Sequence, residues 1–258
     1  MIRIFAQVFI CLITACVPAF AQQPASLTWL GHAAFVYKTP SGSVILIDPW
    51  TQNPKAPKDL KLPERVDGIL VTHGHSDHVG QAFELAKKHG ATFIASFELT
   101  EIAKKNGVEK VMPINQGGTQ MIGKTSVTAV NALHSSSYGD DHEYAGAPLG
   151  FVIREEGGPV VYHAGDTGVF NDMSLIRDLY RVDVALLPIG GVFTMKPTEA
   201  AVAAKFLRAR AVVPMHFGTF PILTGTSKEL GEAMKRAGAS GKVRELTIGK
   251  ETKIKELM

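Results

Sequence analysis

The chain has 258 residues, 45% hydrophobic and 20% charged, with a formal net charge of +3. This length can bury a sizeable core in one domain or two small ones, and no internal repeat, low-complexity tract or long polar linker divides it. So small a positive charge argues against a nucleic-acid-binding protein and leaves a small molecule as the expected partner.

The first 21 residues differ in kind from the rest. Arg3 precedes an apolar run that ends at Val17, and the sequence Ala19-Phe20-Ala21 follows. A charged start, a short apolar core and an Ala-x-Ala site are typical of a secretory signal peptide. We therefore expect cleavage after Ala21 and export of residues 22–258, as one domain, to the periplasm. The apolar run is too short to span a membrane comfortably.

A second interpretation of the leader stays open. The residues Ile13-Thr14-Ala15-Cys16 resemble a lipoprotein box, which would leave the protein anchored by a lipid on Cys16. Cys11 and Cys16 are the only cysteines, and cleavage at Ala21 would remove both. The mature chain would then have neither disulfides nor thiolate ligands.

Apolar runs bounded by turn residues predict the strands of the first half, at 27–30, 34–37, 43–47, 68–71, 92–95 and 126–130. Helices are expected at 81–89 and 99–106, each followed by glycine, and a proline- and lysine-rich loop at 52–63.

The second half repeats this alternation. We expect a hairpin turning at 155–158, helices at 172–181, 198–208 and 226–237, strands at 184–188 and 212–215, and a final strand pair at 243–248 and 252–254. Thr226 and Glu229 form the capping-box pattern. Two comparable halves of mixed strand and helix predict an α/β fold with two sheets packed face to face and helices outside.

The strongest chemical signal is the segment from Val71 to His78, Val-Thr-His-Gly-His-Ser-Asp-His. It follows an apolar strand, so its side chains are presented at the edge of a sheet. His73 and His75 could share one metal ion, and Asp77 and His78 could turn towards a second. Imidazole and carboxylate without thiolate suit zinc, manganese or iron.

Three later segments repeat the same order of apolar strand, ligand type and small residue. His134, Asp166 and His216 each end such a strand, and the last two stand next to or near glycine. An isolated His or Asp is more often structural than a ligand. Four recurrences along one chain indicate a two-metal site.

The order of these residues resembles the metallo-β-lactamase superfamily over nearly the whole chain after residue 26. Segments 31–33, 47–50, 162–167 and 187–195 resemble one branch in particular. That branch comprises poorly characterised metal-dependent hydrolases related to the ascorbate-phosphate lactonases, and more distantly to phospholipase-D-type hydrolases. The resemblance implies an αββα sandwich. It departs from the pattern at Lys196, where relatives often have glycine.

The resemblance also implies a distribution of ligands between two divalent ions, zinc before manganese or iron. His73, His75 and His134 would hold metal one, and Asp166 would bridge the two ions. The ligands of metal two would be Asp77, His78 and His216.

Four further polar residues are open to two interpretations. Asp48 ends an apolar run, and it is either a turn residue before Pro49 or a carboxylate that supports metal two. His32 could be a structural histidine or a pocket residue, and the pocket is favoured because the Gly-His turn recurs in the related branch. His163 is balanced between the metal surroundings and the core. His142 could contact the substrate, but a solvated loop is favoured.

Two ions roughly 3.5–4 Å apart can hold a hydroxide between them. We therefore expect a hydrolase of an ester, lactone, amide or phosphoester, with Asp166 as the bridge and Asp77 as acceptor of the nucleophile's proton. Two alternatives remain, a non-catalytic periplasmic protein that binds metal or a small molecule, and a true β-lactamase. Asp166 argues against the second, since lactamases that do not use cysteine generally lack a bridging carboxylate.

Overall fold

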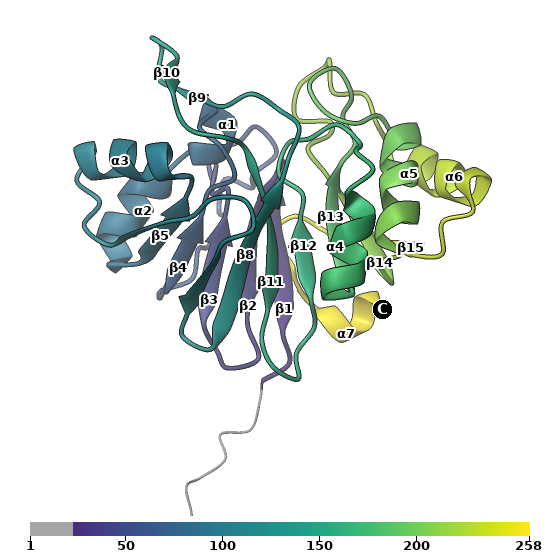
Figure 1. Cartoon of the computed structure of the whole chain (residues 1–258), viewed down its shortest axis with the longest axis horizontal. Coiled ribbons are helices and arrows are strands. Elements are labelled where there is room, and N and C mark those ends of the chain that lie inside the picture. The colour runs from purple at the N-terminus through teal and green to yellow at the C-terminus, as the bar shows by residue number, and fades with distance from the viewer. Residues whose placement is uncertain (1–22) are drawn as a thin grey trace, which may run out of the picture.

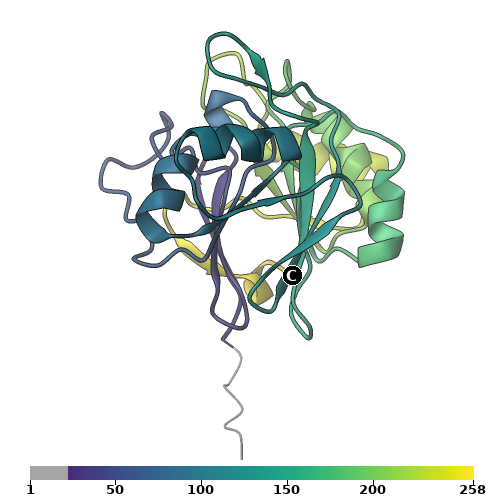
Figure 2. The same ribbon diagram turned by 60° about the vertical axis from the view of Figure 1, so that its left-hand side comes forward.

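Two seven-stranded sheets form the centre of the protein. The computed structural model describes residues 23–258, so the predicted cleavage site after Ala21 and the alternative anchor at Cys16 lie outside the described residues. Turned by 60°, the two sheets stand as separate layers (Figure 2).

The strand order of the first sheet is β16-β1-β2-β3-β4-β5-β6. Its strands are β1 (Ser26–Gly31), β2 (Ala34–Lys38), β3 (Val44–Ile47), β4 (Gly68–Leu70), β5 (Thr92–Ala95), β6 (Val111–Pro113) and β16 (Glu251–Lys253). From β3 to β6 neighbouring strands run parallel.

The strand order of the second sheet is β15-β14-β13-β12-β11-β8-β7. Its strands are β7 (Thr119–Ile122), β8 (Thr125–Asn131), β11 (Leu149–Arg154), β12 (Val161–His163), β13 (Val184–Pro188), β14 (Ala211–Met215) and β15 (Lys242–Val243). The run from β12 to β15 is parallel. A separate hairpin, β9 (Ser137–Tyr138) and β10 (Glu143–Tyr144), projects from one end of the molecule (Figure 1).

Helices cover the outer face of each sheet (Figure 1). On the first sheet lie α1 (Ser76–Val79), α2 (Ala82–His89) and α3 (Phe97–Lys105), and on the second lie α4 (Met173–Tyr180), α5 (Pro197–Leu207) and α6 (Ser227–Ala237). A last short helix, α7 (Ile254–Leu257), adds Ile254 and Leu257 to the core between the sheets. The expected αββα sandwich is confirmed, and no helix among residues 23–258 has the length and apolar character to cross a bilayer.

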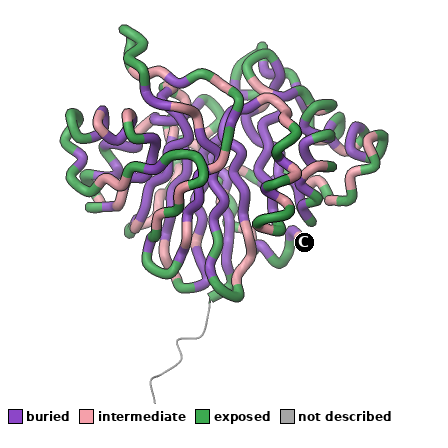
Figure 3. Tube along the Cα trace, in the orientation of Figure 1, coloured by how far each residue is buried: buried purple, intermediate pink, exposed green. Residues whose placement is uncertain are grey.

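Three apolar clusters hold these layers together. The largest lies between the sheets and contains Phe35, Ile47, Leu70, Phe151 and Val213. The other two lie under the helices of each outer face. The strands are buried along most of their length, whereas the hairpin tip and the helix surfaces are exposed (Figure 3). Burial of apolar surface on both faces of each sheet explains why several strands are continuously apolar rather than alternating.

Local sequence signals predicted most element ends correctly. Helix α2 ends where Gly90 adopts a left-handed conformation (φ 58°), which glycine adopts without a Cβ penalty. The Thr226 hydroxyl accepts a hydrogen bond from the Glu229 amide at 3.2 Å at the start of α6.

The predicted final strand pair is wrong. Strand β15 is only two residues long and pairs with β14 in the second sheet, while β16 pairs with β1 in the first. Each segment completes the edge of a different sheet, so their nearness in sequence does not make them partners.

Candidate metal centre

Seven predicted ligands meet at the end of the sandwich where β3, β4, β12 and β14 finish. Strand β4 leads into the loop that carries His73 and His75 and then into α1, which carries Asp77 and His78. The remaining three follow strands of the second sheet, His134 after β8, Asp166 after β12 and His216 after β14. Loops at the carboxyl ends of parallel strands are a usual place for ligand sites in α/β proteins.

The first group consists of His73, His75 and His134. Their ligand atoms all lie within 4.8 Å of one another, and His73 Nε2 is 2.9 Å from His75 Nδ1. The His134 ring stands nearly perpendicular to both other rings. Burial is the largest cause that lowers the pKa of all three, so each imidazole is neutral, the form that binds metal.

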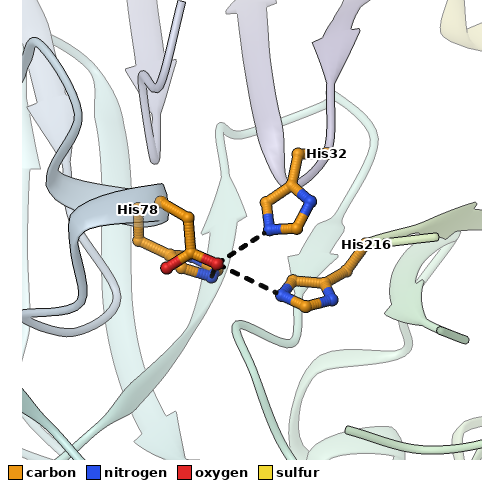
Figure 4. A group of neighbouring side chains, drawn as sticks. His32, His78 and His216 are labelled. Atoms are coloured by element: carbon orange, nitrogen blue, oxygen red, sulfur yellow. Dashed lines mark hydrogen bonds and ion pairs between the residues drawn. The ribbon is translucent and has the colours of Figure 1, made fainter. Parts of the chain in front are cut away.

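The second group consists of His32, Asp77, His78 and His216, with ligand atoms again within 4.8 Å of one another. In Figure 4 dashed lines run from the rings of His32 and His216 to one carboxylate oxygen beside His78. The acceptor of both contacts is Asp77 Oδ2. Asp77 Oδ2 lies 3.7 Å from His216 Nε2 and 4.0 Å from His78 Nε2.

Asp166 lies between the two groups. Its Oδ2 atom is 2.9 Å from His216 Nε2, 3.3 Å from His78 Nε2 and 3.7 Å from His134 Nε2. The side chain is almost completely buried, and it also forms a compact group with His73 and His78. One carboxylate thus faces imidazoles of both groups.

Several buried polar atoms of this centre have no partner in hydrogen-bond geometry among residues 23–258. They are His78 Nε2, both ring nitrogens of His216, and Asp166 Oδ1. A buried polar atom without a partner costs free energy, so these unpaired donor atoms favour a group that the protein binds here. Imidazole nitrogens and carboxylate oxygens are suitable donors for Zn²⁺, so the residues present fit divalent metal ions.

The charges of the centre influence one another strongly. Burial would raise the pKa of Asp77, but the imidazoles of His78, His216 and His32 outweigh it and hold the pKa well below its usual range. Burial likewise opposes protonation of His216, yet Asp166 and Asp77 raise its pKa to about 9. The pKa of His78 also rises, since three carboxylates outweigh its burial. Without metal, protons supply the positive charge that the carboxylates require.

A buried carboxylate, Asp48, supports one imidazole in each group. His78 Nδ1 lies 2.7 Å from Asp48 Oδ2, and the Thr72 hydroxyl donates to the same oxygen at 2.7 Å. That hydroxyl oxygen lies 3.0 Å from His73 Nδ1. Both imidazoles therefore use Nδ1 for support and turn Nε2 inward.

Three residues of the centre adopt backbone conformations that L-residues rarely use. The φ angles are 53° at His32, 44° at Asp48 and 53° at His216. Each residue comes directly after, or one residue beyond, the end of a strand. Such conformations cost free energy and cluster at functional sites. The backbone strain at these three residues accompanies the orientation of their side chains into the centre.

Comparison with known proteins identifies the family. A model of the β-lactamase superfamily domain matches residues 43–217. The chain belongs to this superfamily. It is 49% identical over 231 residues to the UPF0173 metal-dependent hydrolase of Myxococcus xanthus, a match that covers 88% of this chain and 82% of that protein. The hydrolase of the same name from Rubrobacter xylanophilus is 47% identical over 229 residues, or 87% of this chain and 95% of that protein.

Solved structures agree with this assignment. A metallo hydrolase from the archaeon Ignicoccus hospitalis superposes with a TM-score of 0.79 at 35% identity, covering 89% of this chain and 98% of that one. A diiron β-hydroxylase from Streptomyces venezuelae shares the fold with a TM-score of 0.69 at 16% identity. The chain is thus a metal-dependent hydrolase of the metallo-β-lactamase superfamily, as predicted, while the relation to ascorbate-phosphate lactonases stays a prediction.

A cavity of about 460 Å³ opens beside the metal centre of this hydrolase. Its walls are His75, Ser76 and Asp77 on one side, and the β9–β10 hairpin with Ser137, Gly139, Asp140 and His142 on the other. We predicted that His142 lies in a solvated loop. The residue is exposed, and it also lines the cavity. The hairpin is joined to α3 by an ion pair of 2.8 Å between Glu143 and Lys105.

Both ring nitrogens of His163 contact backbone atoms. Its Nε2 atom lies 3.0 Å from the Ala33 carbonyl oxygen, and its Nδ1 accepts a hydrogen bond from the Gly165 amide at 3.1 Å. Both ring nitrogens are therefore occupied. The residue ties the turn after β1 to the turn that carries Asp166.

Three further residues next to this centre were not predicted from the sequence. Thr219 lies 2.9 Å from His32 Nδ1. Trp50 stacks on Phe220 with a ring-centroid distance of 5.9 Å, and both rings stand edge-on to His32. Phe220 is 40% exposed, so the metal centre has an apolar side as well as the polar cavity. The unusual Gly190-Gly191 run could have pointed to this region, since a Cβ on Gly190 would collide with the His216 carbonyl oxygen.

Proposed function

We propose that this hydrolase holds two divalent ions and uses them to cleave an ester, lactone, amide or phosphoester. His73, His75 and His134 would hold the first ion. The second would lie among Asp77, His78 and His216, with Asp166 between the two. The orphaned, buried nitrogen and oxygen atoms that converge there carry this proposal. Zinc fits this donor set best, and manganese or iron would also be accepted.

When bound, such ions would supply Lewis acidity that lowers the pKa of a water molecule and polarises the bond to be broken. The protein's own contribution is to place ionised carboxylates at the cavity wall. Asp77 is 27% exposed there, and its lowered pKa keeps the carboxylate ionised, as a metal ligand or a proton acceptor must be. Asp166 is buried behind it and would hold the two ions in a fixed relation.

The walls of the cavity favour uncharged substrates. Its lining side chains include the carboxylates of Asp77 and Asp140 and, within the described residues, neither lysine nor arginine. Apart from the two ions, a dianionic phosphate monoester would meet no cationic side chain of this lining and one further carboxylate, Asp140, whose like charge disfavours binding. We therefore place neutral esters, lactones and amides ahead of phosphomonoesters.

The test is a turnover panel with p-nitrophenyl esters, lactones, amides, phosphodiesters and β-lactams, run on protein loaded separately with Zn²⁺ and Mn²⁺. Asp77→Asn and Asp166→Ala should each lower kcat/KM by at least about a thousandfold, comparable to the loss of a principal electrostatic group, with the fold retained by circular dichroism. A metal-loaded protein that binds a small molecule tightly, never converts it and is unchanged by Asp77→Asn would instead be the non-catalytic binding protein.

We further propose that the protein works in the periplasm after removal of residues 1–21. The charged start, short apolar run and Ala19-Phe20-Ala21 site support export. Attachment through a lipid on Cys16 is the competing possibility, and the mature N-terminus distinguishes the two.

A further inference from the structure

His32 is buried, and hydrogen bonds hold its backbone in place. It lies in the turn between β1 and β2 and is 1% exposed. Its carbonyl oxygen accepts hydrogen bonds from the His216 amide at 3.0 Å and from Trp29 Nε1 at 2.9 Å. Its ring therefore has a fixed position relative to the second metal group.

Both ring nitrogens of His32 are already engaged. Nε2 lies 3.0 Å from Asp77 Oδ2 and Nδ1 lies 2.9 Å from Thr219 Oγ1. An ionised carboxylate only accepts hydrogen bonds, so the nitrogen that faces Asp77 must carry the proton. In a neutral imidazole Nδ1 is then an acceptor, and the Thr219 hydroxyl donates to it.

This arrangement separates His32 from the other imidazoles of its group. Among residues 23–258, Nε2 of His78 and Nε2 of His216 have no partner in hydrogen-bond geometry, although they lie 3.3 and 2.9 Å from Asp166 Oδ2. Nε2 of His32 instead makes a hydrogen bond of 3.0 Å with Asp77 Oδ2, a geometry suited to supporting that carboxylate. On the basis of distance alone, His32, His78 and His216 would all be counted as metal ligands.

Among residues 23–258, Asp77 makes no other side-chain hydrogen bond. Its next contacts, to His216 and His78, are 3.7 and 4.0 Å long, beyond hydrogen-bond range. It stands on α1, a helix of four residues, at the wall of the open cavity. Without His32, its carboxylate could turn away from the metal centre towards water.

We propose that His32 is a positioning residue that holds the Asp77 carboxylate towards the second metal ion, with Thr219 fixing the tautomer that does so. The inference rests on the proposed two-metal function. His32 itself does not bind metal. Supporting partners of this kind change metal affinity by about 10–100-fold when they are removed.

The experiment titrates metal-free protein with Co²⁺ against a chromophoric chelator, which yields a separate Kd for the first and second equivalents. X-ray absorption of the saturated protein counts imidazoles per cobalt. His32→Ala should raise the Kd for the second equivalent of Co²⁺ about 10–100-fold. The Kd for the first equivalent and the number of imidazoles per cobalt should stay unchanged. His32→Gln, whose amide nitrogen can reach Asp77 in place of Nε2, should recover most of the loss. Thr219→Val should produce a smaller loss in the same direction.

His142→Ala serves as the matched control, since it removes an imidazole from the cavity wall outside both metal groups. It should leave both equivalents unchanged. If His32→Ala fails to fold, the Gln and Thr219 variants still decide the question.

Two outcomes overturn the inference. If the second cobalt of His32→Ala has one imidazole fewer than in the wild type, His32 is a ligand. If the Kd of the second equivalent is unchanged in His32→Ala, His32 is only a packing residue. A wild-type protein that binds no second equivalent at all would overturn the two-metal function itself, which is a separate result.

Discussion

His78 and Asp48 are joined by a contact of 2.7 Å between Nδ1 and Oδ2, and solvent reaches neither side chain. The carboxylate accepts only, so it determines which nitrogen of His78 carries a proton and which one faces the centre. Through the Thr72 hydroxyl the same carboxylate also orients His73. One buried residue that would touch neither ion thus orients an imidazole in each group.

Replacing Asp48 should therefore affect stability and metal binding together. Asp48→Ala leaves His78, whose pKa is raised well above its usual value, charged and buried beside fewer carboxylates. Breaking a buried ion pair costs about 3–5 kcal/mol, which urea unfolding of the metal-free protein would measure. Thr72→Val, which removes the hydroxyl between Asp48 and His73 but leaves the contact between Asp48 and His78, is the control. Equal stability of Asp48→Ala and wild type would contradict this account.

The metal content of the purified protein should be about two divalent ions per chain. His134→Ala should deplete the first ion preferentially, because His134 belongs to the group with His73 and His75. Elemental analysis by mass spectrometry after dialysis provides the count. Protein that stays metal-free after purification without chelator and after reconstitution would remove the basis of the proposed chemistry.

The stability of the metal-free protein should fall as the pH rises through about 9. The pKa of His216 is raised from 6.5 to about 9 because Asp166 and Asp77 outweigh its burial. Its protonation therefore stabilises the fold fully below pH 6.5, and that contribution disappears as the folded-state pKa is passed. Thermal unfolding between pH 6 and 10 should show the decline, and His216→Gln should reduce it.

Metal binding should show the opposite pH dependence over the same interval. The second ion must displace protons from His216 and His78, whose raised pKa values keep them protonated near neutrality. The affinity for the second ion should increase with pH, with proton release visible by calorimetry in buffers of different ionisation enthalpy. A pH-independent affinity would mean that these imidazoles are not ligands.

The hairpin carboxylate Asp140 should discriminate against anionic substrates. Asp140→Asn removes a negative charge from the cavity wall without touching either metal group. We expect a lower KM for a phosphodiester, by about two- to fivefold as for one exposed charge, with little change for a neutral ester. Identical changes for both substrates would indicate a structural effect instead.

Mass spectrometry of the native protein should find an N-terminus at Gln22. The reason is the Ala-x-Ala site that ends at Ala21. An acylated Cys16 would establish the lipoprotein alternative, and an intact Met1 would contradict export by either route.

The fold and most of the centre could be predicted because their signals are local. A strand followed by His or Asp places that side chain at a sheet edge wherever the strand lies, so His73, His134, Asp166 and His216 could all be recognised. The role of His32 could not be predicted in this way. Its partner Thr219 lies 187 residues further along the chain, and only the packing of one sheet on the other brings them together.

The same reason explains the error at the C-terminus. Residues near 243 and 252 both have strand character, and nearness in sequence suggested a pair. The edge of the first sheet was open to β16 and the edge of the second to β15. The sheet edge that a short strand joins depends on the arrangement of the whole sandwich. It cannot be predicted from the residues of that strand alone.

The division of the centre between the two sheets has a consequence for how the protein would acquire its metal. The side chains that meet there come from residues as far apart as His32 and His216, so no early fragment of the chain carries a complete set. Full coordination can be assembled only after nearly the whole polypeptide has folded. The compartment in which folding finishes, rather than the one in which synthesis takes place, would then determine which ion the protein receives.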